Sequence, residues 1–238
     1  MKTMLNLFIA SILTISVGNL IAAPSNNYNA SLEKDKALKT IAKATAAFED
    51  VMDDPKTCIP QTLIDKSEGI VILPGTLKLA VGTIGGQGGR GIAMIRKEDG
   101  SWSNPFFITL GEGSLGIQIG AQSTDMVLLF KHRIDVLEID EAEIMLGGDV
   151  EVAAGPESDG SHSNTDIRFE REIYSYYRSR GLFAGASLNG GVLSYNESVN
   201  DAYYGMAFTD NHEILDMVDT PFSAEVSDLI ETINIYGK

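Results

Sequence analysis

The chain has 238 residues and a formal net charge of −15, because 33 acidic residues stand against 18 basic ones. This surplus of negative charge repels phosphate backbones and argues against general nucleic-acid binding. Hydrophobic residues make up 44% of the chain, which is enough apolar material for one large globular domain and argues against a disordered protein.

Residues 1–23 have the pattern of a secretory signal peptide. Lys2 precedes a mostly apolar run from Leu5 to Val17, and the small residues Ala22 and Ala23 mark a plausible cleavage site. The run is short for a bilayer span, although a short membrane anchor is the alternative interpretation. We therefore expect export to the periplasm, the outer envelope or the medium. The single cysteine, Cys58, allows no intramolecular disulfide, which favours bacterial export.

Residues 24–36 form the expected leader and helix start, with Ser31 as a candidate N-cap. From Leu32 to Met52 the apolar residues follow helical spacing, and lysines lie on the opposite face of the predicted helix. Two interpretations remain open. The helix docks its apolar face on the core and leaves the lysines solvated, or it lies on a membrane with the lysines at anionic headgroups.

The rest of the chain alternates short predicted strands with helices. A short helix is expected at Ile59–Lys66, with Pro60 in its first turn, and a final helix with Thr220 as N-cap and Pro221 in the first turn. Between them, strands are expected at 69–74, 92–95, 105–113, 126–130 and 172–178, and a glycine-rich strand pair at 181–194. Short helices are expected at 132–139 and 211–217.

The motif G-x-G-x-x-G occurs twice, at Gly86–Gly91 and at Gly111–Gly116. In a dinucleotide-binding turn this motif must be followed by a helix, whereas both copies here are followed by strand patterns. The glycines are therefore expected to permit bends and close backbone approach. The expected structural glycines of the first run are Gly82, Gly85, Gly86, Gly88, Gly89 and Gly91.

Common catalytic and metal-binding patterns are missing from the sequence. There is no G-x-S-x-G elbow and no phosphate-binding P-loop, and the three histidines share no ligand spacing. Ten acidic residues lie between Arg133 and Arg168, but their spacing does not match a calcium loop. We expect no cofactor, no metal and no enzymatic activity. The competing hypothesis is an enzyme whose site gathers His132, Asp125 or Cys58.

These patterns predict an α+β fold in a single domain. We expect a glycine-rich, strongly curved, mostly antiparallel sheet or barrel, flanked by N-terminal and C-terminal helices.

The order of motifs resembles the SYLF domain family. The relevant runs are IPQTLIDKSEGIVILP, GTIGGQGGRGIAMIRKEDGSWSNPFF, GSLGIQIGAQSTDMVLLF and YSYYRSRGLFAGASLNGGVLSYN. The resemblance covers residues 37–236. It implies a non-catalytic lipid-binding module, since eukaryotic members bind phosphoinositides and fungal members also bind and bundle actin.

By position, the resemblance assigns lipid contact to Lys34, Lys36, Lys39 and Lys43. Leu38, Ile41 and Phe48 would then insert into the lipid. With the signal peptide, the expected function is binding of lipid or a membrane surface in the bacterial envelope, with protein partners unknown. The alternative is an envelope structural or protein-interaction domain without a lipid ligand.

Overall fold

The computed structural model describes residues 26–55, 58–141, 144–146, 152–154, 172–185, 191–206, 210, 214 and 222–237. The predicted signal peptide and most of the acidic segment before Arg168 lie outside these residues. So does most of the helix expected at 211–217.

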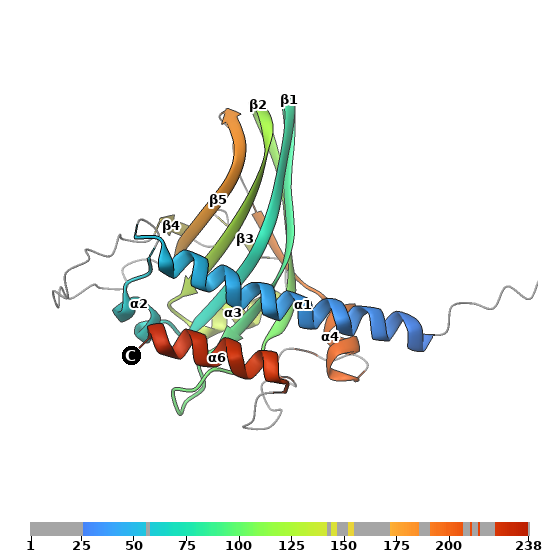
Figure 1. The fold of residues 1–238 in the computed structure, drawn as a ribbon, viewed down its shortest axis with the longest axis vertical. Helices are drawn as coiled ribbons and strands as arrows, with labels where there is room; N and C mark the ends of the chain where they lie inside the picture. Colours follow the sequence, from blue (N-terminus) through green and yellow to red (C-terminus); the bar gives the residue numbers. More distant parts are fainter. Residues whose placement is uncertain are drawn as a thin grey trace, which may run out of the picture.

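Within the described residues, helices pack around one β-sheet (Figure 1). The helices are α1 (Asn26–Asp53), α2 (Gln61–Lys66), α3 (Arg133–Glu141), α4 (Glu197–Tyr204) and α6 (Ala224–Tyr236). The strands are β1 (Gly69–Ile95), β2 (Phe106–Phe130), β3 (Ile144–Leu146), β4 (Val152–Ala154), β5 (Ile173–Gly185) and β6 (Gly191–Tyr195).

Strand β2 is the centre of the sheet. It pairs with β1 along almost its whole length, while its first half also pairs with β6 and its second half with β5. The strand order is β3-β6-β2-β5-β4, with β1 beside β2, and among the described strands only the β4–β5 pair is parallel. The α+β class and the mostly antiparallel sheet are thus confirmed. A barrel is not confirmed, because this order is an open path in the described part of the chain.

Strand β1 folds back on itself. Gln87 Nε2 donates a hydrogen bond of 2.8 Å to Thr76 Oγ1, although eleven residues of straight strand would separate them by about 35 Å. The register with β2 shifts between Gly82 and Ile84, and Gly82 has a φ of 72°. The chain therefore turns at Gly82, and the two halves of β1 lie beside each other.

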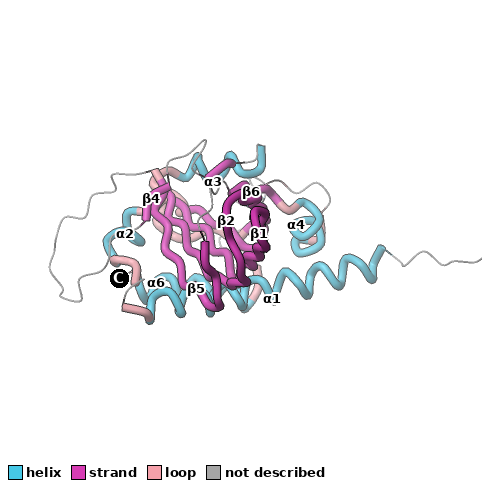
Figure 2. The backbone as a smooth tube through the Cα atoms, turned by 90° about the horizontal axis from the view of Figure 1, so that it is seen from above, coloured by secondary structure: helices cyan, strands magenta, loops and turns pink. Residues whose placement is uncertain are grey.

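The core lies between the lower part of the sheet and the helices. Ile41 and Phe48 of α1, Leu63 of α2 and Leu229 of α6 are fully buried there, together with Phe130 of β2. Helices α1 and α6 lie on one side of the sheet and α3 on the other (Figure 2). The upper part of β1, β2 and β5 extends beyond the helices (Figure 1).

Several predicted boundaries were wrong. Helix α1 already begins at Asn26, so Ser31 lies inside it and caps nothing. Pro60 is the N-cap of α2 and lies before its first turn. The last helix is capped by Ser223, whose side chain accepts a hydrogen bond from Val226 N, and Thr220 lies outside the described residues.

Candidate functional site

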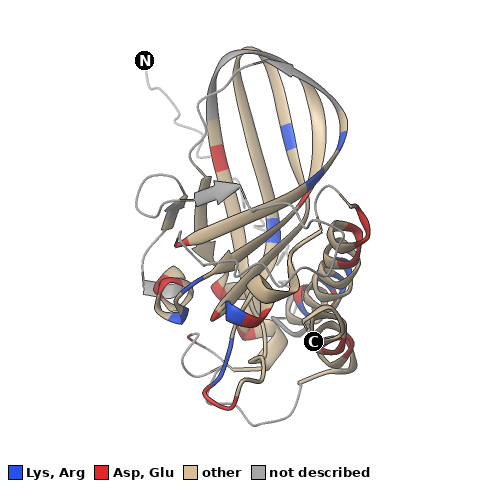
Figure 3. Cartoon of the chain, turned by 90° about the vertical axis from the view of Figure 1, so that its left-hand side faces the viewer, with Lys and Arg blue, Asp and Glu red and all other residues tan. Residues whose placement is uncertain are grey.

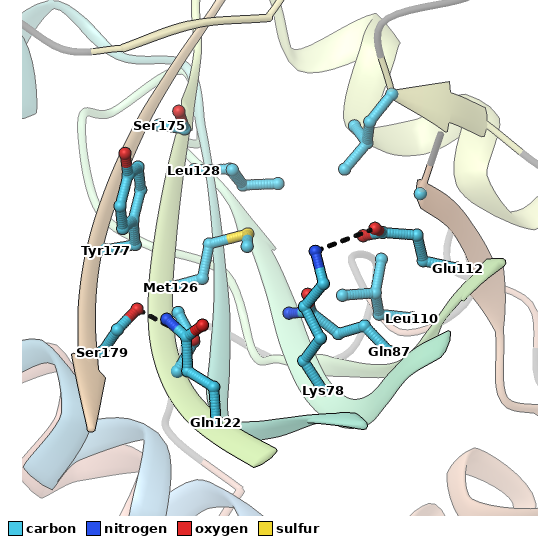
Figure 4. A pocket seen from close by; sticks show the side chains of 13 residues that line it. Lys78, Gln87, Leu110, Glu112, Gln122, Met126, Leu128, Ser175, Tyr177 and Ser179 are labelled. Carbon is cyan, nitrogen blue, oxygen red and sulfur yellow. Dashed lines mark hydrogen bonds and ion pairs between the residues drawn. The ribbon is translucent and has the colours of Figure 1, made fainter. Parts of the chain in front are cut away.

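A cavity of about 380 Å³ lies between the two halves of β2 (Figure 4). Leu110 and Glu112 from the first half line one wall, and Met126 and Leu128 from the second half line another. The remaining lining residues are Lys78, Gln87, Gln122, Thr124, Leu146, Ser175, Tyr177, Ser179 and Gly191. Its size falls within the roughly 300–1,000 Å³ that is usual for small-molecule sites.

Lys78 and Glu112 approach each other across this cavity (Figure 4). Lys78 Nζ is 3.8 Å from Glu112 Oε1, and the two side chains are only 10% and 9% exposed. Burial raises the pKa of the Glu112 carboxyl, and the positive charge of Lys78 opposes this effect. Among the described residues, Glu112 Oε1 has no hydrogen-bond partner.

An unusual strip of exposed apolar side chains covers the upper sheet on the face opposite Lys78. Leu77, Leu79 and Val81 alternate along β1 and are 49%, 52% and 79% exposed, and Ile119, opposite Val81 on β2, is 67% exposed. Ile84, at the bend, is 69% exposed. We call these five residues the apolar strip. Contiguous exposed apolar surface of this kind marks an interaction site in most soluble proteins.

The strip begins where α1 ends its contact with the sheet. Arg178 and Arg180 of β5 both bind the Asp50 carboxylate of α1, and Arg180 also lies 3.2 Å from Asp125. Ser123 of β2 pairs with Arg180 on one side and with Leu77 on the other. The apolar strip is therefore the uncovered continuation of the face on which α1 docks.

Apart from Glu112, the upper sheet is poor in acidic residues. No Asp or Glu occurs in the segments 75–96, 113–124 and 173–196, although the whole chain carries 33 of them. Figure 3 shows most acidic positions on the helices and lower loops, whereas the upper arch of the strands carries mainly basic bands among its charged positions. The net negative charge thus belongs to the lower body of the molecule.

The lysines proposed from the sequence all lie on α1 and are exposed: Lys34, Lys36, Lys39 and Lys43. Lys36 Nζ forms an ion pair of 2.6 Å with Glu33, and Lys36 also lines a shallow depression with Arg90 of β1. None of the four lysines lines the cavity.

The expected insertion of Leu38, Ile41 and Phe48 into lipid needs correction. Ile41 and Phe48 are fully buried against the sheet and the other helices, and Leu38 is partly buried against the same core. The docked α1 therefore offers a membrane its lysines but not these apolar side chains.

The first glycine run has two geometrical roles. Gly82 adopts the positive φ that the bend requires. A Cβ on Gly89 would lie 2.6 Å from Thr76 Cγ2, and one on Gly91 would lie 2.3 Å from Ile72 O. Gly88 has no such constraint, because its Cβ would come no closer than 3.6 Å to Leu110 O.

Both G-x-G-x-x-G motifs lie within strands. Gly86 pairs with Gly113 and Gly88 with Gly111, so the two copies face each other across the β1–β2 ladder. Residues His132, Asp125 and Cys58, which an assembled enzyme site would gather, do not line the cavity. Within the described part of the chain, no three His, Cys, Asp or Glu side chains are arranged to hold a metal ion.

Comparison with known proteins identifies the family of this chain. The family model "Ysc84: Las17-binding protein actin regulator" matches residues 111–236, which is more than half of the chain. The chain belongs to the Ysc84 family. This confirms the resemblance to the SYLF domain family, to which the Ysc84 proteins belong. The family is described as an actin regulator, which is not an enzymatic role.

Curated relatives extend the similarity over most of the chain. SH3 domain-containing YSC84-like protein 1 from Homo sapiens is 30% identical over 214 residues, which cover 90% of this chain and 60% of the relative. The Xenopus laevis protein of the same name is 31% identical over 81% of this chain and 56% of its own length. Protein YSC84 from Saccharomyces cerevisiae is 30% identical over 80% and 40%. The chain thus spans about 60% of the length of these relatives or less.

The sequence correctly predicted that the four lysines are exposed on a helix, but neither the cavity nor the apolar strip was predicted from it. The alternation in LKLAV was a usable signal for the strip, since it places leucine, leucine and valine on one face. The cavity gave no local signal, because its lining residues come from five strands and meet only after β1 and β2 fold back.

Proposed function

We propose that this Ysc84-family domain is a non-catalytic membrane-surface binding protein. The apolar strip is the observation that carries this proposal. It projects beyond the helices, belongs to a segment without acidic residues, and is the part of an otherwise anionic molecule that can approach a lipid surface without charge repulsion.

Magnitudes favour the strip over the lysines as the main contact. Fully burying a valine, leucine or isoleucine side chain contributes about 1.5–3 kcal/mol. A lysine near an anionic membrane contributes about 1 kcal/mol and is screened by salt. In our proposal the strip inserts, and Lys34, Lys36, Lys39 and Lys43 add a weaker, salt-dependent attraction.

We further propose that the protein is exported and meets lipid in the bacterial envelope. This rests on the pattern of residues 1–23 alone. Among the described residues, no helix is both long enough and apolar enough to cross a bilayer.

A second candidate is a protein-interaction domain without a lipid ligand. The family description, which names Las17 binding and actin regulation, favours it. Co-sedimentation with filamentous actin, without lipid, distinguishes this candidate from membrane binding.

Vesicle co-sedimentation of the chain from Pro24 onward tests the membrane proposal. We expect Val81→Gln/Ile119→Gln to weaken binding to anionic vesicles by at least about tenfold, since two insertions are lost. The matched control is Ile134→Gln/Ile235→Gln, which alters two comparably exposed isoleucines on α3 and α6. Equal binding by both double variants and the wild type would exclude the strip as the contact.

The same assay separates the lysines from the strip. Lys36→Gln/Lys39→Gln/Lys43→Gln should leave binding at high salt unchanged and remove most of the gain seen at low salt. If this variant binds like the wild type at every salt concentration, these lysines are a solvated face with no role in binding.

A further inference from the structure

The cavity contains a buried carboxylate oxygen that lacks a donor. Glu112 is only 9% exposed, and its Oε1 has no hydrogen-bond partner among the described residues. An unsatisfied buried acceptor is costly, so such an atom in a cavity wall indicates that a ligand supplies the donor. Lys78 lies beside it at 3.8 Å, which is beyond hydrogen-bond distance.

The cavity wall formed by the second half of β2 is polar at one end and apolar at the other. Along the second half of β2 the lining residues change from Gln122 and Thr124 to Met126 and Leu128. Leu110 and Leu146 add to its apolar surface. Figure 4 shows Gln122, Lys78 and Gln87 toward one end and Leu128 toward the other, where Ser175, the partner of Leu128 on β5, adds a hydroxyl. This division suits an amphiphile with one polar head and one apolar chain.

The charges restrict the head group. Lys78 and Glu112 together contribute no net charge, so a head with a single full charge would leave one of these buried charges repelled or unbalanced. The unsatisfied Glu112 oxygen requires a head that donates a hydrogen bond. A hydroxylated neutral head meets both conditions.

We propose that this cavity binds one single-chain amphiphile whose uncharged head group donates a hydrogen bond to Glu112. A monoacylglycerol is the simplest molecule of this class. The site lies inside the sheet and opposite the apolar strip, so it goes beyond the membrane-surface function and stands independently of it.

Titration calorimetry with monomeric ligands tests this proposal. Monolauroylglycerol should bind at least about tenfold more tightly than methyl laurate, which has the same chain but no hydroxyl donor. Laurate should also bind more weakly than monolauroylglycerol, and glycerol should show no binding. No binding of monolauroylglycerol, or equal affinity for it and methyl laurate, would overturn the proposal.

Variants connect this preference to the two charged residues. Lys78→Met/Glu112→Leu removes both partners together, which is tolerated better than removal of one. We expect it to bind the two laurate esters equally. The matched control, Lys97→Met/Glu98→Leu in the hairpin before β2, should keep the tenfold preference. An unchanged preference in the Lys78/Glu112 variant would refute the assignment of the head-group site.

Two further variants make the binding experiment decisive. If the double variant does not fold, Glu112→Gln replaces it, and its weaker acceptor should reduce the preference several-fold. The strip variant Val81→Gln/Ile119→Gln should bind monolauroylglycerol like the wild type. A loss of vesicle binding and a loss of ligand binding in the cavity can therefore be told apart.

Discussion

At the residue scale, the long side chain of Arg96 organises the turn between Arg96 and Trp102. Its guanidinium donates hydrogen bonds to the carbonyl oxygens of Ile64, Ser67 and Gly100, and it lies 4.3 Å from the Trp102 ring centroid. One side chain thus joins the end of α2 to the hairpin before β2. No local sequence pattern indicated that Arg96 would supply these bonds.

The raised pKa of Glu112 predicts a pH-dependent stability. Because burial favours the protonated acid in the folded state, the stability that Glu112 contributes is present below its ordinary pKa of 4.5 and is lost as the pH rises through the folded pKa. Glu112→Gln does not titrate. Its melting temperature relative to that of the wild type should therefore increase from about pH 4 to about pH 7.

Thermal unfolding followed by circular dichroism measures this difference across the pH range. Glu98→Gln, which changes an exposed glutamate in the hairpin before β2, is the matched control. A difference that stays constant with pH, or that increases toward acid, would contradict the assigned burial of Glu112.

At the element scale, the fold-back of β1 explains both the site and the glycines. Turning at Gly82 places Gly89 and Gly91 against Thr76 and Ile72, where a side chain does not fit. The same turn brings Lys78 close to Glu112 and exposes Val81 at the bend. Helical and strand periodicity are local signals, so they placed most elements but could not show that one strand returns along itself.

A pair of glycine substitutions tests this geometry. Gly91→Ala should lower the free energy of unfolding by about 1–3 kcal/mol, because its Cβ would collide with the Ile72 carbonyl oxygen. Gly88→Ala should change it by less than about 0.5 kcal/mol, since its Cβ meets only ordinary contact. Urea denaturation measures both, and equal losses would show that the two halves of β1 are not packed as described.

The sequence was a better guide to α1 than to the site. Its amphipathic pattern predicted the exposed lysines and the apolar face, but the same pattern is compatible with docking on a core or on a membrane. The structure shows that α1 docks on the core, since Ile41 and Phe48 are fully buried. The apolar strip was not predicted, because the exposure of its side chains depends on how far α1 covers the sheet. No local sequence pattern shows where that cover ends.

At the scale of the whole molecule, charge and hydrophobicity are segregated. The acidic body lies around the helices, and the end of the sheet that is poor in acidic residues carries the apolar strip (Figure 3). This arrangement gives the domain one end that a membrane can accept and another that it repels. The proposed export of the protein would present this end to envelope lipid.

Export predicts a defined mature chain. If residues 1–23 are a signal peptide, the protein recovered from the envelope or medium should begin at or near Pro24, and its intact mass should show the loss of this segment. Recovery of the full-length chain would exclude cleavage and leave a retained N-terminal anchor.

The most direct measurement follows the strip itself as the protein meets a membrane. An environment-sensitive fluorophore is attached to a cysteine at Val81 in a Cys58→Ser background, and matched proteins carry it at Ile235 or Glu98. With anionic vesicles, we expect a blue shift and quenching by spin-labelled lipid at position 81 and little change at positions 235 and 98. Vesicle binding without any change at position 81 would contradict the claim that the upper sheet is the membrane contact.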